Sequence, residues 1–135
     1  MKVKTISWLL GIAILSLTTV EAQAHRLRPA IVTISFEQAG SVEVDISLNM
    51  EAILAGVSPT HEDTDDSPNA PEYEQLRALP PDALIENIRA FEKNYLDGIR
   101  IEFDGKPTVL RLANIEVPEI GDTARQRLSV LSLSL

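Results

Sequence analysis

The chain has 135 residues, with 12 basic and 20 acidic side chains that give it a formal net charge of −8 at neutral pH. This length fits one domain, and an acidic surface repels phosphate backbones, so nucleic acid is excluded as a partner while cations and basic surfaces are favoured. The sequence contains no cysteine, which excludes disulfide bonds, thiolate metal sites and cysteine nucleophiles.

Residues 1–24 have the three parts of a secretory signal. Two lysines near the start form a positive region, an apolar run extends from Ile6 to Val20, and Ala22-Gln23-Ala24 is a small-x-small cleavage site. The alternative is a retained membrane anchor, but the run of about 15 residues is shorter than the roughly 20 that span a bilayer. We expect cleavage, export to the periplasm or another extracytoplasmic location, and a mature domain over residues 25–135.

Two segments near the start of the mature region predict an antiparallel hairpin. Residues 30–36 are rich in β-branched side chains, and residues 42–48 alternate apolar with polar side chains. A turn at residues 38–41 joins the two segments. Alternation of this kind predicts that the hairpin buries one face and exposes the other to water.

A short helix, a polar loop and a second short helix are expected next. Asn49 can cap a helix over residues 50–55, and Gly56 can end it. Residues 57–72 form a polar stretch with three prolines, which predicts a long loop. Residues 72–79 predict a short helix after this loop.

Residues 82–97 predict the main helix of the domain. Leu84, Ile88, Phe91 and Tyr95 recur at intervals of four, three and four residues, which places them on one face of a helix. We expect this amphipathic helix to pack against the sheet.

The last part of the chain returns to strand patterns. Residues 99–103 alternate, Asp104-Gly105 is a strong hairpin signal, and residues 108–117 supply the return strand. Residues 127–135 predict a final strand. Polar and apolar residues still alternate up to Leu135. This pattern indicates a chain that is truncated at its C-terminus or continues beyond this residue.

These elements together predict an α+β fold. We expect mainly an antiparallel β-sheet or a small β-sandwich, with one packed amphipathic helix. The two hairpins, over residues 30–48 and 99–117, are expected to form its core.

A candidate metal site begins at His25, which becomes the first mature residue after cleavage. Its α-amine and imidazole, with the imidazole of His61, would supply three nitrogen ligands suited to copper, and nickel can use similar ligands. The alternative is that His25 is a frayed terminal residue and His61 a solvated loop residue.

The acidic loop is a second candidate cation site, for calcium. Five of its oxygen-bearing side chains have the spacing of a calcium loop at positions 1, 3, 5, 7 and 12. They are Asp63, Asp65, Ser67, Asn69 and Glu74. Pro68 stands where such a loop needs glycine, which disfavours an EF-hand. A looser site that uses Asp63 and Asp65 and a plain solvated loop both remain open, and the solvated loop is the simpler interpretation.

The sequence shows no catalytic constellation. It has no Gly-x-Ser-x-Gly motif and no glycine-rich phosphate loop. Carboxylate pairs such as Glu43 and Asp45 have the spacing of outward-facing strand residues. We therefore expect a protein without enzymatic activity and without catalytic residues.

The segment Ala24-His25-Arg26-Leu27-Arg28-Pro29-Ala30, directly after the signal, resembles the mature start of HupE/UreJ-type bacterial membrane proteins. The resemblance implies an extracytoplasmic β-rich region that precedes a bundle of membrane helices, accessory work for hydrogenase or urease, and uptake of nickel or another metal ion. It also implies that this chain is the extracytoplasmic part alone.

Two hypotheses for the function follow. The first is an exported binding or accessory module of a membrane-associated assembly, whose partner is a membrane protein or a C-terminal membrane region missing from this chain. The second is a small copper- or nickel-binding protein that uses His25, with calcium as a less favoured ion. The sequence leaves the oligomeric state open.

Overall fold

The computed structural model describes residues 28–36, 41–61, 63–121 and 127–135. Helices and strands follow one another along these residues in the order expected of an α+β protein. They are β1 (Ile31–Phe36), β2 (Val42–Leu48), α2 (Met50–Leu54), the 3₁₀ helix η1 (Thr64–Asp66), α3 (Ala70–Arg77), α4 (Pro81–Asp97), β3 (Glu102–Phe103), β4 (Lys106–Pro107), β5 (Arg111–Glu116) and β6 (Ser129–Ser134).

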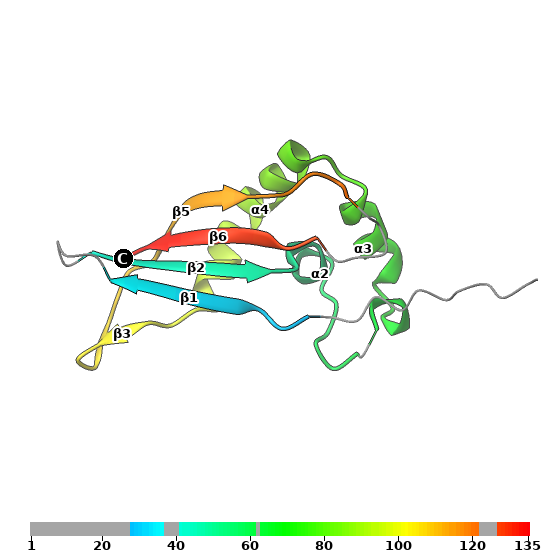
Figure 1. The fold of residues 1–135 in the computed structure, drawn as a ribbon. Coiled ribbons are helices and arrows are strands. Elements are labelled where there is room, and N and C mark those ends of the chain that lie inside the picture. Colours follow the sequence, from blue (N-terminus) through cyan, green and yellow to red (C-terminus); the bar gives the residue numbers. More distant parts are fainter. Residues whose placement is uncertain (1–27, 37–40, 62, 122–126) are drawn as a thin grey trace, which may run out of the picture.

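Four of the strands form one antiparallel sheet in the order β1-β2-β6-β5. Figure 1 shows α4 behind this sheet and the shorter helices α2 and α3 at one end of it. The predicted α+β class, with an antiparallel sheet and a packed amphipathic helix, is therefore confirmed. The strand predicted over residues 127–135 is present as β6, which lies between β2 and β5 although it is the latest of the four in sequence.

The core lies between the sheet and the helices. On the covered face, Val44 pairs with Leu133 and Ile46 pairs with Leu131, and Leu84 and Ile88 of α4 are almost fully buried. Each such side chain stabilises the fold by roughly 1.5–3 kcal/mol through removal of apolar surface from water. Phe91 and Tyr95 continue the apolar face of α4 and are partly buried against the same core.

Local signals set the ends of several elements as predicted. The Asn49 side chain caps α2 by accepting a hydrogen bond from the backbone N of Ala52, and Gly56 follows the helix with a φ of +70°. A side chain there would be strained, since this backbone conformation favours glycine. The helix predicted over residues 82–97 is present as α4.

The long loop predicted over residues 57–72 is wrong in part. Residues 64–66 form the 3₁₀ helix η1, and α3 already begins at Ala70. Pro71 occupies the first turn of α3, where the missing N–H has no helical partner to lose. The prolines of this region therefore start a helix as well as turning the chain.

The prediction that the first hairpin buries one face holds for β2 and is wrong for β1. The pairing of β1 with β2 is present over its whole length, but all six residues of β1 are exposed. The reason is the position of the helical layer, since α4 packs against β5 at the opposite edge of the sheet.

The prediction that a hairpin over residues 99–117 forms part of the core is also wrong. Its turn is correct, because Asp104 and Gly105 have φ values of 50° and 74°, as a tight two-residue hairpin turn needs. However, β3 and β4 form only a small exposed ribbon. The strands separate after Thr108, and β5 pairs with β6 instead, where Leu112 and Ile115 are buried.

Candidate functional site

Among the residues that the structure describes, those predicted to bind metal do not form a common site. His25 lies outside the described residues. His61 is partly buried just before η1, and Asp65 is exposed. The Asp63 side chain caps η1, where its Oδ1 accepts a hydrogen bond from the backbone N of Asp65 at 3.1 Å. Within the described part of the chain, no group of three or more His, Asp or Glu side chains could hold a metal ion.

The other side chains with calcium-loop spacing have local structural contacts. Ser67 is buried and its Oγ accepts a hydrogen bond from the backbone N of Asn69. The Asn69 side chain donates to the backbone oxygen of Gly56 at 3.0 Å. Glu74 forms an ion pair of 2.8 Å with Arg77 on the next turn of α3. The spacing that suggests a calcium loop thus coincides with contacts that shape the turn into α3.

A buried ion pair joins α2 to the segment that leads into β6. Arg127 Nε donates to Glu51 Oε1 at 2.7 Å, and the two side chains are only 8% and 1% exposed. The same guanidinium donates to the backbone oxygens of Leu79 and Leu76, at 3.0 Å and 3.4 Å. Through these hydrogen bonds, Arg127 links the segment before β6 to α2 and to the C-terminal end of α3.

A buried amide–phenol contact joins the N-cap of α2 to α3. Asn49 Nδ2 donates to the hydroxyl oxygen of Tyr73 at 2.8 Å. Burial raises the pKa of Tyr73 above its ordinary value of 10.0, and the hydrogen bond to Asn49 offsets part of this rise. The sequence indicated Asn49 only as a helix cap. It carries no local signal for the partners of Tyr73 or Arg127, because those partners come from distant segments.

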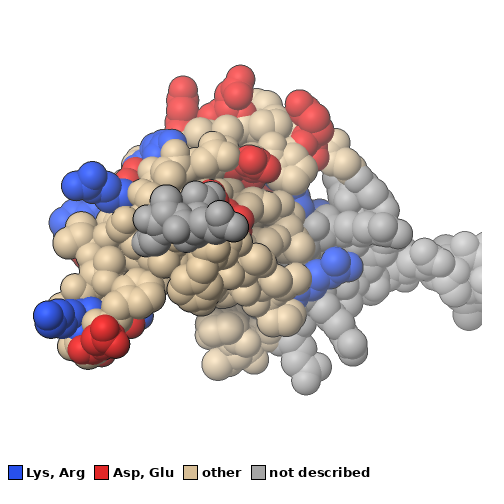
Figure 2. All heavy atoms as spheres, turned by 60° about the vertical axis from the view of Figure 1, so that its left-hand side comes forward, with Lys and Arg blue, Asp and Glu red and all other residues tan. Residues whose placement is uncertain are grey.

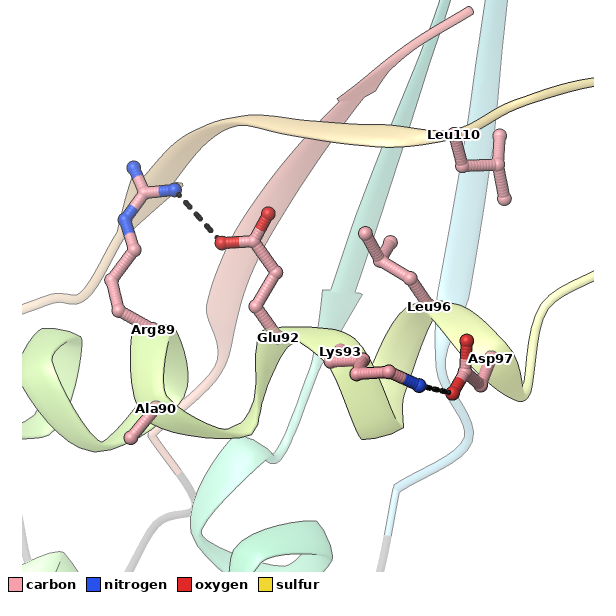
Figure 3. Close-up of a pocket in the computed structure, with 7 residues that line it drawn as sticks. All are labelled: Arg89, Ala90, Glu92, Lys93, Leu96, Asp97 and Leu110. Atoms are coloured by element: carbon pink, nitrogen blue, oxygen red, sulfur yellow. Dashed lines mark hydrogen bonds and ion pairs between the residues drawn. The ribbon is translucent and has the colours of Figure 1, made fainter.

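An open groove of about 510 Å³ runs between α4 and the segment before β5 (Figure 3). Its charged side chains pair with one another, Arg89 with Glu92 at 3.5 Å and Lys93 with Asp97 at 2.5 Å. Leu96 and Leu110 supply apolar surface. A ligand site normally offers convergent polar groups in a concave, mainly apolar setting. The paired charges of this groove do not provide such a set.

The outer edge of the sheet at β1 is the most unusual surface feature. Its four large apolar side chains are more than half exposed. They are Ile31 at 60%, Val32 at 55%, Ile34 at 53% and Phe36 at 74%. The register places Val32, Ile34 and Phe36 opposite Ile46, Val44 and Val42. We call these three residues the apolar row, because they continue the core face of the sheet beyond its helical cover.

The two edges of the sheet differ in how they are protected. The strand β5 carries Arg111 and Glu116, a register shift after Leu112, and α4 packed against it. The segment Pro29–Phe36 has no charged residue. Figure 2 shows acidic side chains gathered near the top of the view above a largely uncharged surface. Charges, bulges and covering helices are the usual means of preventing edge-to-edge pairing. Among the described residues, β1 itself carries no charge and no register shift, and no helix covers its side chains.

No family model, curated protein or solved structure matches this chain. The helices of the described residues include none with the length and apolar character needed to cross a membrane. The case for a function therefore depends on the geometry of the chain itself.

Proposed function

We propose that this chain is an exported, non-enzymatic binding domain that pairs the edge of β1 with a polypeptide segment in a membrane-associated assembly. The observation that carries the proposal is the contrast between the two edges of the sheet. One edge is charged, bulged and covered by α4, whereas the edge at β1 is uncharged and leaves the apolar row exposed.

Strand addition is the binding mode that such an edge supports. The unpaired N–H and C=O groups of an edge strand form hydrogen bonds with an added strand, and side chains of alternate residues give the contact its specificity. On β1, the apolar row would contact alternate apolar residues of the partner. This contact removes exposed apolar surface from water, which favours association.

The place of action is proposed from the first part of the sequence. The cleavage site that ends at Ala24 supports export, and the resemblance of residues 24–30 to HupE/UreJ-type proteins supports a partner at a membrane. The absence of a catalytic motif in the sequence supports a binding role over an enzymatic one.

A strand-peptide titration tests the proposal. We would add a blocked peptide that alternates Val with Thr to the isotope-labelled chain and follow backbone amide resonances by NMR. The expected result is a saturable shift of the β1 amides. Ile34→Lys should abolish it, because a charge then stands in the apolar row. Val109→Lys is the matched control, since Val109 is 76% exposed outside the sheet, and it should leave binding unchanged.

If the peptide shifts no β1 resonance at any soluble concentration, the proposed function is wrong. Equal binding by the Ile34→Lys chain would contradict it as well. Circular dichroism of both variants checks that the lysine leaves the fold intact, which is expected because both positions are exposed.

A further inference from the structure

The polar face of the sheet carries two carboxylates beside β1. Glu43 and Asp45 stand on β2, directly opposite Ser35 and Thr33 of β1. Glu43 is exposed, and Asp45 accepts a hydrogen bond from Ser132 Oγ at 2.6 Å. Since directly opposed residues point to the same face of a sheet, both carboxylates lie on the face opposite the apolar row.

The strands nearest to these carboxylates supply no basic side chain. Neither β1, β2 nor β6 contains Lys or Arg. In the cross-strand row of Glu43, the basic residue is Arg111 on β5, with Ser134 of β6 between the two. Arg28 precedes β1, but it lies toward the end of the strand that pairs with Ser47, away from Glu43. Arg111 therefore lies two strands from Glu43 on the β5 side, whereas the described residues of β1 supply no basic side chain on the other side.

The side chains of β1 leave a path from that edge to the carboxylates. A strand added beside β1 would lie about 9.6 Å from β2, which is two strand spacings of about 4.8 Å. The residues between them on this face are Thr33 and Ser35, which are small. The long stem of a lysine or arginine on the added strand can extend over them and bring its charge to Asp45 or Glu43.

We infer, on the basis of the proposed function, that the partner is an extended segment of another protein that alternates large apolar with basic side chains. Its apolar residues contact the row formed by Val32, Ile34 and Phe36. Its basic residues lie over Thr33 and Ser35 and pair with the two carboxylates of β2.

A second copy of this chain fits the edge less well. Two β1 strands in symmetrical pairing would offer only Thr33 and Ser35 to each other's carboxylates, with no basic group. Each copy also brings a net charge of −8. Complementary charge favours association and like charge opposes it, so a basic segment is the better partner.

The test compares three blocked peptides that alternate Val with Lys, with Thr or with Glu, each titrated into the labelled chain. We expect the Lys peptide to bind tightest and the Glu peptide weakest. The expected ratio between them is about tenfold at low salt for two exposed ion pairs. The ratio should shrink at high salt, because exposed charges are screened.

Removal of the carboxylates should remove this preference. The variant Glu43→Gln with Asp45→Asn should bind all three peptides within about twofold of one another, since the two ion pairs are lost. Asn retains an acceptor oxygen for Ser132 Oγ. Glu86→Gln with Glu119→Gln makes the same change of net charge at two exposed positions outside the four-stranded sheet. This control should keep the full preference.

The outcomes separate the inference from the proposed function. Peptides that shift the β1 amides with equal affinity would overturn the inference on partner charge and leave strand addition standing. A lack of β1 shifts with all three peptides would overturn both. A concentration-dependent dimer of the chain in sedimentation, abolished by Ile34→Lys, would assign the edge to a second copy and would also overturn the inference.

Discussion

Glu51 and Arg127 are 76 positions apart in the sequence and share a 2.7 Å hydrogen bond inside the protein. Glu51 belongs to α2, and Arg127 leads into β6. Two charges are costly to remove from water, so a pair of this kind stabilises a fold only while both members are present. The pair thus makes the packing of α2 dependent on the segment that carries Arg127.

The cost of breaking this pair gives the first prediction. Arg127→Ala should lower the free energy of unfolding by about 3–5 kcal/mol, because Glu51 is left as an unpaired buried charge. Replacement of both residues, by Glu51→Leu with Arg127→Met, should restore part of this loss, since it leaves no unpaired buried charge. The remainder reflects the backbone oxygen of Leu79, which still loses its donor. Urea unfolding followed by circular dichroism measures both values.

The pair of Lys93 and Asp97 is the control for this measurement. Its side chains are 84% and 64% exposed, and exposed pairs typically contribute about 0.2–1 kcal/mol. Lys93→Ala should therefore have a small effect. If Arg127→Ala costs no more than Lys93→Ala, the Glu51–Arg127 contact does not contribute as a buried ion pair.

The second prediction concerns Asn49 and Tyr73. Asn49→Ala should cost about 1–2 kcal/mol through loss of the cap of α2, and about 1–3 kcal/mol more because the Tyr73 hydroxyl loses its partner. A double-mutant cycle with Tyr73→Phe should give a coupling of about 0.5–3 kcal/mol. Asn94→Ala, at an exposed position of α4, should change stability by less than about 0.5 kcal/mol. Zero coupling between Asn49 and Tyr73 would contradict their hydrogen bond.

The third prediction concerns alkaline pH. Burial raises the pKa of both Tyr73 and Tyr95 above 10.0, so the folded chain holds these protons more firmly than the unfolded chain. The resulting stability is fully present below pH 10 and is lost as pH rises through the folded pKa values. Tyrosinate absorbance should therefore appear above pH 10 in the native chain and at lower pH in urea. In the Tyr73→Phe variant, the absorbance change reports on the ionisation of Tyr95. If the native chain gave the same tyrosine titration curve as the chain in urea, the two side chains would not be buried as described.

The fourth prediction concerns the amino terminus, where His25 is expected to begin the mature chain. If its α-amine and imidazole bind copper or nickel, His25→Ala should abolish binding, and so should one extra residue before His25. Native mass spectrometry of the exported chain, with each metal added, measures the effect. His61→Ala should weaken binding without abolishing it. Affinity that survives both changes at His25 would rule out this metal site.

The parts of the fold that were predictable from the sequence depend on neighbours along the chain. The cap at Asn49 and the turn at Asp104-Gly105 require only a few adjacent residues, and both are present. The apolar face of α4 follows from its own periodicity.

The errors concern contacts between distant segments. The alternation in β1 is the same whether or not a helix covers it, so the pattern could not show that Val32 and Ile34 remain exposed. The return strand after Gly105 has apolar residues that suit several partners, and its pairing with β6 depends on Leu131 and Leu133. A hairpin signal in the sequence specifies the turn. How far the two strands then stay paired depends on whether another strand offers the return strand more apolar burial.

The candidate site was missed for the same reason. No local pattern distinguishes an edge strand that lacks a protecting charge from a central strand that needs none. The β-branched residues over 30–36 predicted a strand of a hairpin with one buried face, and only the strand order shows that β1 is an edge. Similarly, the spacing of Glu43 and Asp45 indicates only outward-facing strand residues. Their position next to an edge strand, where they can pair with a bound segment, comes from the strand order.

The central position of β6 has a consequence for how the protein is made. The hairpin of β1 and β2 is local, but it joins β5 only through residues 129–134. Pairing over such a separation must overcome a large loss of chain entropy before any contact forms, and this slows folding. A growing chain cannot complete its sheet until β6 has left the ribosome. Completion of the sheet is therefore expected to wait for residues 129–134, and β1 and β2 form their local hairpin long before β6 can join them.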